Sequence, residues 1–159
     1  MNVNVTTLND LLNIAIQEEV NAQKFYLMAR EKSTSIKVKN FLFSIANEEK
    51  IHERTLKSIK EMELYDGSLP VDAAMLAAAQ ASHQIEVPDS LHDLSLEDIF
   101  EIAMKKEAQA YTMYDHIAQT AAYEEIKVLF ISMAEEERTH HRRIQEHYRA
   151  KTGQMGYEG

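Results

Sequence analysis

The sequence has 159 residues, 45% hydrophobic content and a formal net charge of -9, which suit a single domain with a substantial core. The negative charge argues against a nucleic-acid surface, and no cluster of Lys or Arg indicates a membrane patch. Because cysteine is absent, disulfides, thiolate clusters and a thiol nucleophile are excluded. The first residues lack a charged leader followed by an apolar run, so a cytoplasmic location is expected.

Only 4 Gly and 2 Pro occur in the chain, which favours long uninterrupted helices. In chain order, long helices are predicted over residues 8–32, 36–63, 96–119 and 123–150. The first begins at Thr7, with Asp10 three positions later, a pattern typical of a capping box. The third repeats this signal with Ser95 and Asp98, so both halves of the chain start in the same way.

One pattern of polar residues occurs in both halves at a constant offset of 88 positions. It consists of a glutamate followed 30 residues later by Glu-x-x-His, in the copies Glu19, Glu49, His52 and Glu107, Glu137, His140. The same offset relates Thr7 to Ser95 and Tyr26 to Tyr114. The sequence therefore consists of two copies of one helical hairpin.

These six residues interrupt helical stripes that are otherwise apolar or aromatic, as Glu19 does between Ala15 and Ala22. Within each half the two glutamates lie equally far from the turn, so they face each other near mid-helix. Four unpaired carboxylates in a core would repel one another and would be costly to bury. Two divalent cations would balance this charge, and the pattern therefore predicts a dinuclear metal site. Four protonated or water-bridged glutamates are the alternative without metal.

A long connection over residues 64–95 joins the hairpins at 8–63 and 96–150, and its alanine-rich stretch 71–84 predicts a short extra helix. Short turns within each half and one long crossover are typical of the ferritin-like topology. The predicted fold class is all-α, a ferritin-like four-helix bundle formed by residues 1–159 as one domain. An open array of two hairpins is the alternative, but it would leave the glutamates unexplained.

The arrangement of these motifs resembles the diiron domain of the rubrerythrin and ferritin-like superfamily over about residues 8–150. A glutamate lies on the first and third long helices, and Glu-x-x-His lies on the second and fourth. The segments FLFSIANEEKIH (41–52) and LFISMAEEERTH (129–140) are similar to that family's second and fourth helices.

The resemblance implies two iron ions as the cofactor, with manganese or zinc as substitutes. It assigns Glu49 and Glu137 as bridges, Glu19 and His52 as the remaining ligands of one ion, and Glu107 and His140 as those of the other. Oxygen and imidazole ligands with open positions suit iron or manganese on general grounds as well.

The function implied is a diiron oxidoreductase of rubrerythrin type, which reduces peroxide or dioxygen with electrons from an external donor such as a rubredoxin. Iron storage with a ferroxidase step is one alternative, and it would require a hollow assembly. A diiron oxygenase is another, and it would require a cleft open to the metals. The expected partners are the oxidant, the donor and, in a homodimer, a second copy of the chain; neither nucleic acid nor a membrane is expected.

Two departures from the family limit what the resemblance implies. Rubrerythrins carry a rubredoxin-like cysteine centre for electron supply, whereas this chain has no cysteine. They also usually carry an extra glutamate one turn after the position of Glu107, where this sequence has Ala110. Since that glutamate exchanges with a histidine when the irons change redox state, rapid peroxide reduction by this exchange is not implied.

Four further residues lie near the predicted ligands. Tyr26 and Tyr114 follow the lone glutamates by two helical turns on the same stripes. They are interpreted either as hydrogen-bond donors to carboxylates of the opposite half, orienting them or supplying an electron, or as plain core tyrosines. Glu48 and Glu136 adjoin the bridging glutamates, and we interpret them as solvated residues in preference to partners of the site.

Overall fold

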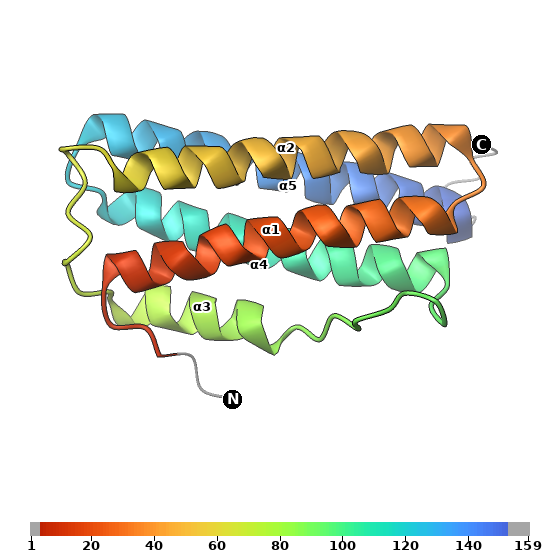
Figure 1. Ribbon diagram of the computed structural model, residues 1–159, viewed down its shortest axis with the longest axis horizontal. Helices are drawn as coiled ribbons and strands as arrows, with labels where there is room; N and C mark the ends of the chain where they lie inside the picture. The colour runs from red at the N-terminus through yellow and green to blue at the C-terminus, as the bar shows by residue number, and fades with distance from the viewer. Residues whose placement is uncertain (1–3, 153–159) are drawn as a thin grey trace.

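The computed structural model describes residues 4–152 and contains five helices (Figure 1). They are α1 (Leu8–Lys32), α2 (Ile36–Lys60), α3 (Ala73–Gln84), α4 (Leu96–Thr120) and α5 (Glu124–Thr152). Helices α1 and α2 pack as one antiparallel hairpin, and α4 and α5 pack as the other. The described residues form no strand beyond one isolated bridge between Thr7 and Pro70. The predicted all-α bundle of two hairpins is confirmed.

The two predicted capping boxes are present at the starts of α1 and α4. The Thr7 hydroxyl accepts a hydrogen bond from the amide of Asp10 at 3.3 Å, and the Asp10 carboxylate accepts one from the amide of Thr7 at 3.1 Å. Ser95 and Asp98 make the same pair of bonds at 3.1 and 3.2 Å. Because these bonds satisfy amides that lack partners within the helix, they fix where each hairpin begins.

The crossover begins by pairing with the start of α1. The amide of Leu8 donates to the carbonyl of Leu69 at 2.8 Å, and the amide of Asn9 donates to that of Gly67 at 3.0 Å. A Cβ at Gly67 would lie 2.2 Å from the Asn9 Oδ1 atom, so a larger residue here would require the exposed Asn9 side chain to move. This pairing draws the chain away from α2, which ends at Lys60, three residues before the predicted end.

The remainder of the crossover runs along the outside of the bundle. Helix α3, present as predicted, packs against α4 and also contacts α1. After α3 the chain follows an extended path toward the start of α4 at the opposite end of the molecule (Figure 1). No helix within residues 4–152 has both the length and the apolar character needed to cross a lipid bilayer.

The core has two apolar clusters separated by a polar layer. One cluster, which contains Leu12, Leu56 and Phe130, fills the end of the bundle where α1 begins. The other, which contains Leu42 and Phe100, fills the opposite end. Between them lie buried glutamates and histidines from all four long helices. The two apolar clusters thus hold the polar side chains at mid-bundle.

Candidate metal centre

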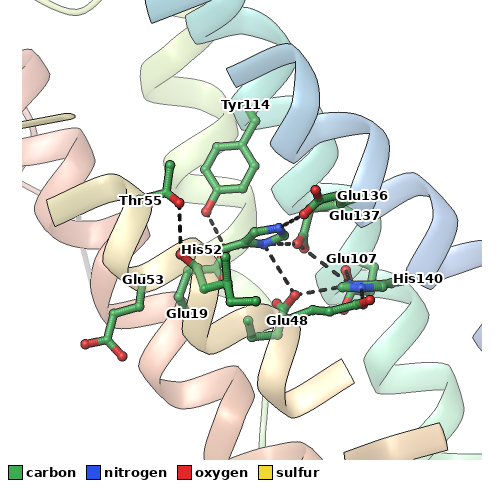
Figure 2. Close-up of polar contacts among 12 residues, drawn as sticks. Glu19, Glu48, His52, Glu53, Thr55, Glu107, Tyr114, Glu136, Glu137 and His140 are labelled. Carbon is green, nitrogen blue, oxygen red and sulfur yellow. Dashed lines mark hydrogen bonds and ion pairs between the residues drawn. The ribbon is translucent and has the colours of Figure 1, made fainter. Parts of the chain in front are cut away.

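The structure brings all six predicted metal ligands together at mid-bundle. Each of the four long helices contributes a glutamate, and α2 and α5 each add a histidine. All six side chains belong to residues that are only 1–2% exposed, namely Glu19, Glu49, His52, Glu107, Glu137 and His140. Figure 2 shows His52 and His140 pointing into the space between the hairpins.

The six residues divide into two overlapping groups, each suited to one metal ion. One group is Glu19, Glu49, His52 and Glu137; the other is Glu49, Glu107, Glu137 and His140. Within each group, one ligand atom per residue lies within 4.8 Å of all the others. Because Glu49 and Glu137 belong to both groups, they occupy the positions at which bridging ligands would lie.

Each histidine directs its Nδ1 atom toward the glutamates. His52 Nδ1 lies 2.7 Å from Glu137 Oε1, 3.5 Å from Glu49 Oε1 and 3.6 Å from Glu19 Oε1. His140 Nδ1 lies 3.1 Å from Glu49 Oε1 and 3.6 Å from Glu107 Oε2. The Nδ1 atoms are therefore the imidazole donors that face a metal pair.

The outer nitrogen of each imidazole contacts a carboxylate from the other hairpin. His52 Nε2 pairs with Glu136 on α5, and His140 Nε2 pairs with Glu48 on α2 (Figure 2). A proton on Nε2 that is shared with a carboxylate leaves the lone pair of Nδ1 available to a metal. The pairs therefore orient both rings.

The structure thus corrects the interpretation of Glu48 and Glu136 as residues of a solvated face alone. Their side chains are 43% and 50% exposed, as that interpretation requires, yet both bind a histidine of the site. The contact depends on how the two hairpins are rotated against each other, which sequence periodicity does not give. The signal that was available is the occurrence of glutamate at this position in both copies of the repeat.

The two tyrosines also reach across to the opposite hairpin. The hydroxyl of Tyr26 donates a hydrogen bond to Glu107 Oε1 at 2.6 Å, and the hydroxyl of Tyr114 donates to Glu19 Oε1. Burial, together with the nearby glutamates, raises the pKa of both hydroxyls well above the usual value. Each tyrosine therefore retains its proton and acts as a donor that holds a carboxylate in place.

The carboxylates differ in how strongly they hold a proton. Burial, followed by repulsion from neighbouring glutamates, raises the pKa of Glu49 and of Glu137 well above the usual value. Burial has the same tendency at Glu107, but the nearby His140 imidazole and the hydrogen bond from Tyr26 lower the pKa of this residue overall. In the absence of metal, the two glutamates shared by both groups are thus the ones that favour protonation.

The histidines take up protons for the same electrostatic reason. Burial by itself would lower the pKa of His52, but Glu19 and Glu49 raise it to about 9. At His140, burial is likewise outweighed by Glu107 and Glu49, which raise the pKa to about 11. Protons therefore supply, in the metal-free protein, part of the positive charge that cations would otherwise provide.

The donor atoms that face the centre lack other partners, which is the pattern that a metal pair would satisfy. Within the described part of the chain, six buried atoms of the site make no hydrogen bond: Glu19 Oε2, Glu49 Oε1, His52 Nδ1, Glu107 Oε2, Glu137 Oε1 and His140 Nδ1. The 2.7 Å contact between His52 and Glu137 is close but lacks hydrogen-bond geometry. Because buried polar atoms are rarely left unsatisfied, these residues fit a dinuclear cation site.

The centre has two chemically different sides. On the side of α2 and α5, the histidines contact the half-exposed carboxylates of Glu48 and Glu136. On the side of α1 and α4 lies a cavity of about 390 Å³, which is bordered by all four buried glutamates and by both tyrosines. The end of α3 and the crossover form its outer wall. The cavity gives the centre a route to small molecules.

Comparisons with known proteins agree with this geometry. A family model described as Rubrerythrin matches residues 10–148. No functionally curated protein shows significant similarity to the chain. A ferritin-like diiron-carboxylate protein from Thermotoga maritima shares the fold, with a TM-score of 0.75 and 21% identity over 90% of this chain and 95% of that one. A hypothetical protein from Pyrococcus furiosus gives a TM-score of 0.66 and 25% identity over 89% and 87%. The chain belongs to the rubrerythrin family.

Proposed function

We propose that the protein is a diiron oxidoreductase that reduces peroxide or dioxygen with electrons from an external donor. The observation that carries this proposal is the pair of buried ligand groups that share Glu49 and Glu137 and border a cavity. Membership of the rubrerythrin family supports iron as the metal. Manganese or zinc would suit the same oxygen and imidazole donors, although zinc cannot change its redox state.

The proposed ligand sets follow the two groups seen in the structure. Glu49 and Glu137 would contact both ions, Glu19 and His52 would complete one, and Glu107 and His140 would complete the other. A ferrous pair held in this way supplies two electrons, one from each ion, to an oxidant.

Side chains next to the proposed ligands hold them in position. Tyr26 and Tyr114 hold Glu107 and Glu19 through hydrogen bonds that cross between the hairpins. Both tyrosines are almost fully buried, at 2% and 1% exposure, so each of these two hydrogen bonds lies in the interior of the bundle. Preorganised polar groups of this kind need little rearrangement when the charge of the centre changes.

Electron supply is proposed to come from another protein. The chain has no cysteine and so cannot itself hold a rubredoxin-like iron centre. A rubredoxin is the donor that family membership favours. Electrons would enter on the side of α2 and α5, where Glu48 and Glu136 connect the histidines with the surface.

Stopped-flow oxidation of the iron-loaded, reduced protein tests this proposal. We expect hydrogen peroxide to oxidise the diferrous protein at least as readily as dioxygen does. We expect multiple turnovers in an NADH-coupled assay only when rubredoxin and its reductase are added. The zinc-loaded protein is the matched control, since it preserves the ligand set without redox chemistry.

Two results would contradict the proposal. Faster oxidation by dioxygen, followed by accumulation of ferric ions in a large hollow assembly, would identify an iron-storage protein. If neither oxidant changes the spectrum of a fully loaded diferrous sample, the centre is not an oxidant-reducing site.

A further inference from the structure

We propose that the cavity beside the candidate metal centre binds the organic group of an alkyl or aryl hydroperoxide. The preferred substrate is then a molecule ROOH, in which R is an apolar group, and not hydrogen peroxide. This inference rests on the proposed function, because it specifies the substrate class of the same centre.

The size of the cavity exceeds what a small oxidant needs. Its volume is about 390 Å³, whereas one water molecule takes up about 30 Å³ in the liquid. Part of this space, beside the glutamates, would hold the metal ions. Hydrogen peroxide and dioxygen each contain two heavy atoms and would leave most of the remainder unfilled. Cavities of roughly 300–1,000 Å³ are typical of sites for small organic molecules.

Away from the buried glutamates the cavity wall combines an apolar patch with polar residues such as Asn21, Lys24 and Asp89. Phe25 and Met28 of α1, Met113 of α4, and Ile85 and Val87 of the crossover all border it. Apolar surface of this kind favours an alkyl or aryl group over water. The hydroperoxide end, by contrast, would point toward the buried carboxylates and the tyrosine hydroxyls at the floor.

Two alanines leave room beside the candidate ligands. Ala22 follows Glu19 by three positions, and Ala110 follows Glu107 by three positions, so both lie one turn beyond a glutamate of the centre. Both alanines border the cavity. They are related by the same offset of 88 residues as the ligands, so both halves of the molecule contribute a small side chain to the cavity wall.

The outer wall is tied to the bundle by one lysine. Lys106 Nζ on α4 lies 2.9 Å from Glu18 Oε2 on α1 and donates a hydrogen bond to the carbonyl of Ser82 at 3.2 Å. All three residues border the cavity. This link holds the end of α3 across the space between α1 and α4, at the outer wall of the cavity.

The reaction balances with the reactants already named. The O–O bond of ROOH breaks, and two electrons and two protons convert it into the alcohol ROH and water. The two ferrous ions lose one electron each, and the external donor restores them. The organic group does not react, so the product alcohol has the same shape and serves as a binding probe.

The first experiment measures binding without redox chemistry. Titration calorimetry follows 2-phenyl-2-propanol, the alcohol formed from cumene hydroperoxide, as it is added to the full-length zinc-loaded protein. We expect saturable binding with one alcohol per chain. Binding should be lost in Ala22→Leu and in Ala110→Leu, which place extra methyl groups in the cavity. The matched control is Ala108→Leu on α4, where the residue is exposed and does not border the cavity.

The second experiment compares substrates on the iron-loaded protein. In the wild type, kcat/KM for cumene hydroperoxide should exceed kcat/KM for hydrogen peroxide by at least about tenfold. An increase of this size in kcat/KM is typical when a substrate group fills an apolar pocket. The ratio of the two kcat/KM values should fall by about tenfold in either cavity variant. It should not change in Ala108→Leu. Melting temperatures of all four proteins establish that each one is folded.

The results separate the inference from the proposed function. If the alcohol does not bind, or binds Ala22→Leu and Ala110→Leu as tightly as the wild type, the inference is wrong even when hydrogen peroxide is reduced. It is also wrong if the bound alcohol is itself oxygenated by dioxygen, since the cavity would then belong to an oxygenase. If neither peroxide oxidises the diferrous protein, the substrate assignment fails; if dioxygen does not oxidise it either, the proposed function fails as well.

Discussion

At the scale of single residues, the shared glutamates differ from the other candidate ligands. Glu49 and Glu137 belong to both ligand groups, whereas each histidine belongs to one. The wild-type protein should therefore bind two metal ions per chain, and Glu137→Ala should lose both. His52→Ala should mainly weaken one. Glu135→Ala, on the same helix but 59% exposed at its side chain, is the control and should retain both ions.

Metal analysis of purified protein, made in iron-supplemented cells, measures this difference directly. A stoichiometry near one in the wild type would contradict the dinuclear arrangement. Unchanged occupancy in Glu137→Ala would contradict the bridging position of that residue.

The contact between Glu136 and His52 can be tested by its effect on metal affinity. Glu136 contacts the outer nitrogen of His52, and its replacement by glutamine keeps the size but removes the charge. We expect Glu136→Gln to weaken metal affinity by about 10–100-fold, the usual effect of removing a group that orients a histidine ligand. Competition with a coloured chelator measures the affinity, and Glu135→Gln is the matched control. Equal affinity in the two variants would show that the contact does not support the centre.

At the scale of helices, the N-terminal cap of α4 should contribute to the free energy of unfolding. Ser95 caps α4 through its hydroxyl, and alanine cannot make that bond. Ser95→Ala should therefore lower the free energy of unfolding by about 1 kcal/mol. Ser58→Ala, at an exposed position within α2, is the control and should cause no loss. Urea unfolding of the metal-free proteins measures both, and equal stability of the two variants would contradict the role of the cap.

Helix positions were largely predictable because their signals are local. Capping residues and apolar periodicity indicated α1 and α4 to within one residue, and the constant offset of 88 indicated the hairpin repeat. The end of α2 was predicted three residues too late. There the pairing of Leu69 and Gly67 with the first turn of α1 draws the chain out of the helix. That pairing joins residues far apart in sequence, and periodicity does not report it.

The sequence predicted the residues of the candidate site but not the cavity beside it. The six inward residues follow from their place in apolar stripes, and the structure brings all of them together. For the two tyrosines the sequence left two interpretations open, and the hydrogen bonds that cross between the hairpins agree with the first, donation to carboxylates of the opposite half. The cavity was not predictable, because it depends on where the crossover residues Ile85 and Val87 lie over α1 and α4.

At the scale of the whole molecule, the bundle confines negative charge between two apolar clusters. The clusters at either end exclude water from the layer that holds the four glutamates. Metal ions that bind this arrangement only when the chain is folded would add to the stability of the native state. Protons perform part of the same role without metal, which makes the stability of the metal-free protein depend on pH.

The direction of this dependence follows from the raised pKa values. The pKa of His52 is about 9 in the folded protein, against an ordinary value of 6.5, so its stabilising contribution is complete below pH 6.5 and is lost as the pH rises through 9. His140, with a pKa of about 11, acts in the same direction. The raised pKa values of Glu49 and Glu137 also favour lower pH. Glu107 differs from these two glutamates, because its lowered pKa gives a contribution that is lost as the pH falls.

The melting temperature of the metal-free protein should therefore fall between pH 6.5 and pH 9. That of the metal-loaded protein should hold steady or rise, because metal ions compete with protons for the same atoms and bind better when protons leave. Differential scanning calorimetry at several pH values measures both curves. In metal-free His52→Gln the fall should be shallower, since one of the raised pKa values is removed. A metal-free protein that becomes more stable over this range, or parallel curves with and without metal, would mean that the buried glutamates are satisfied by other partners.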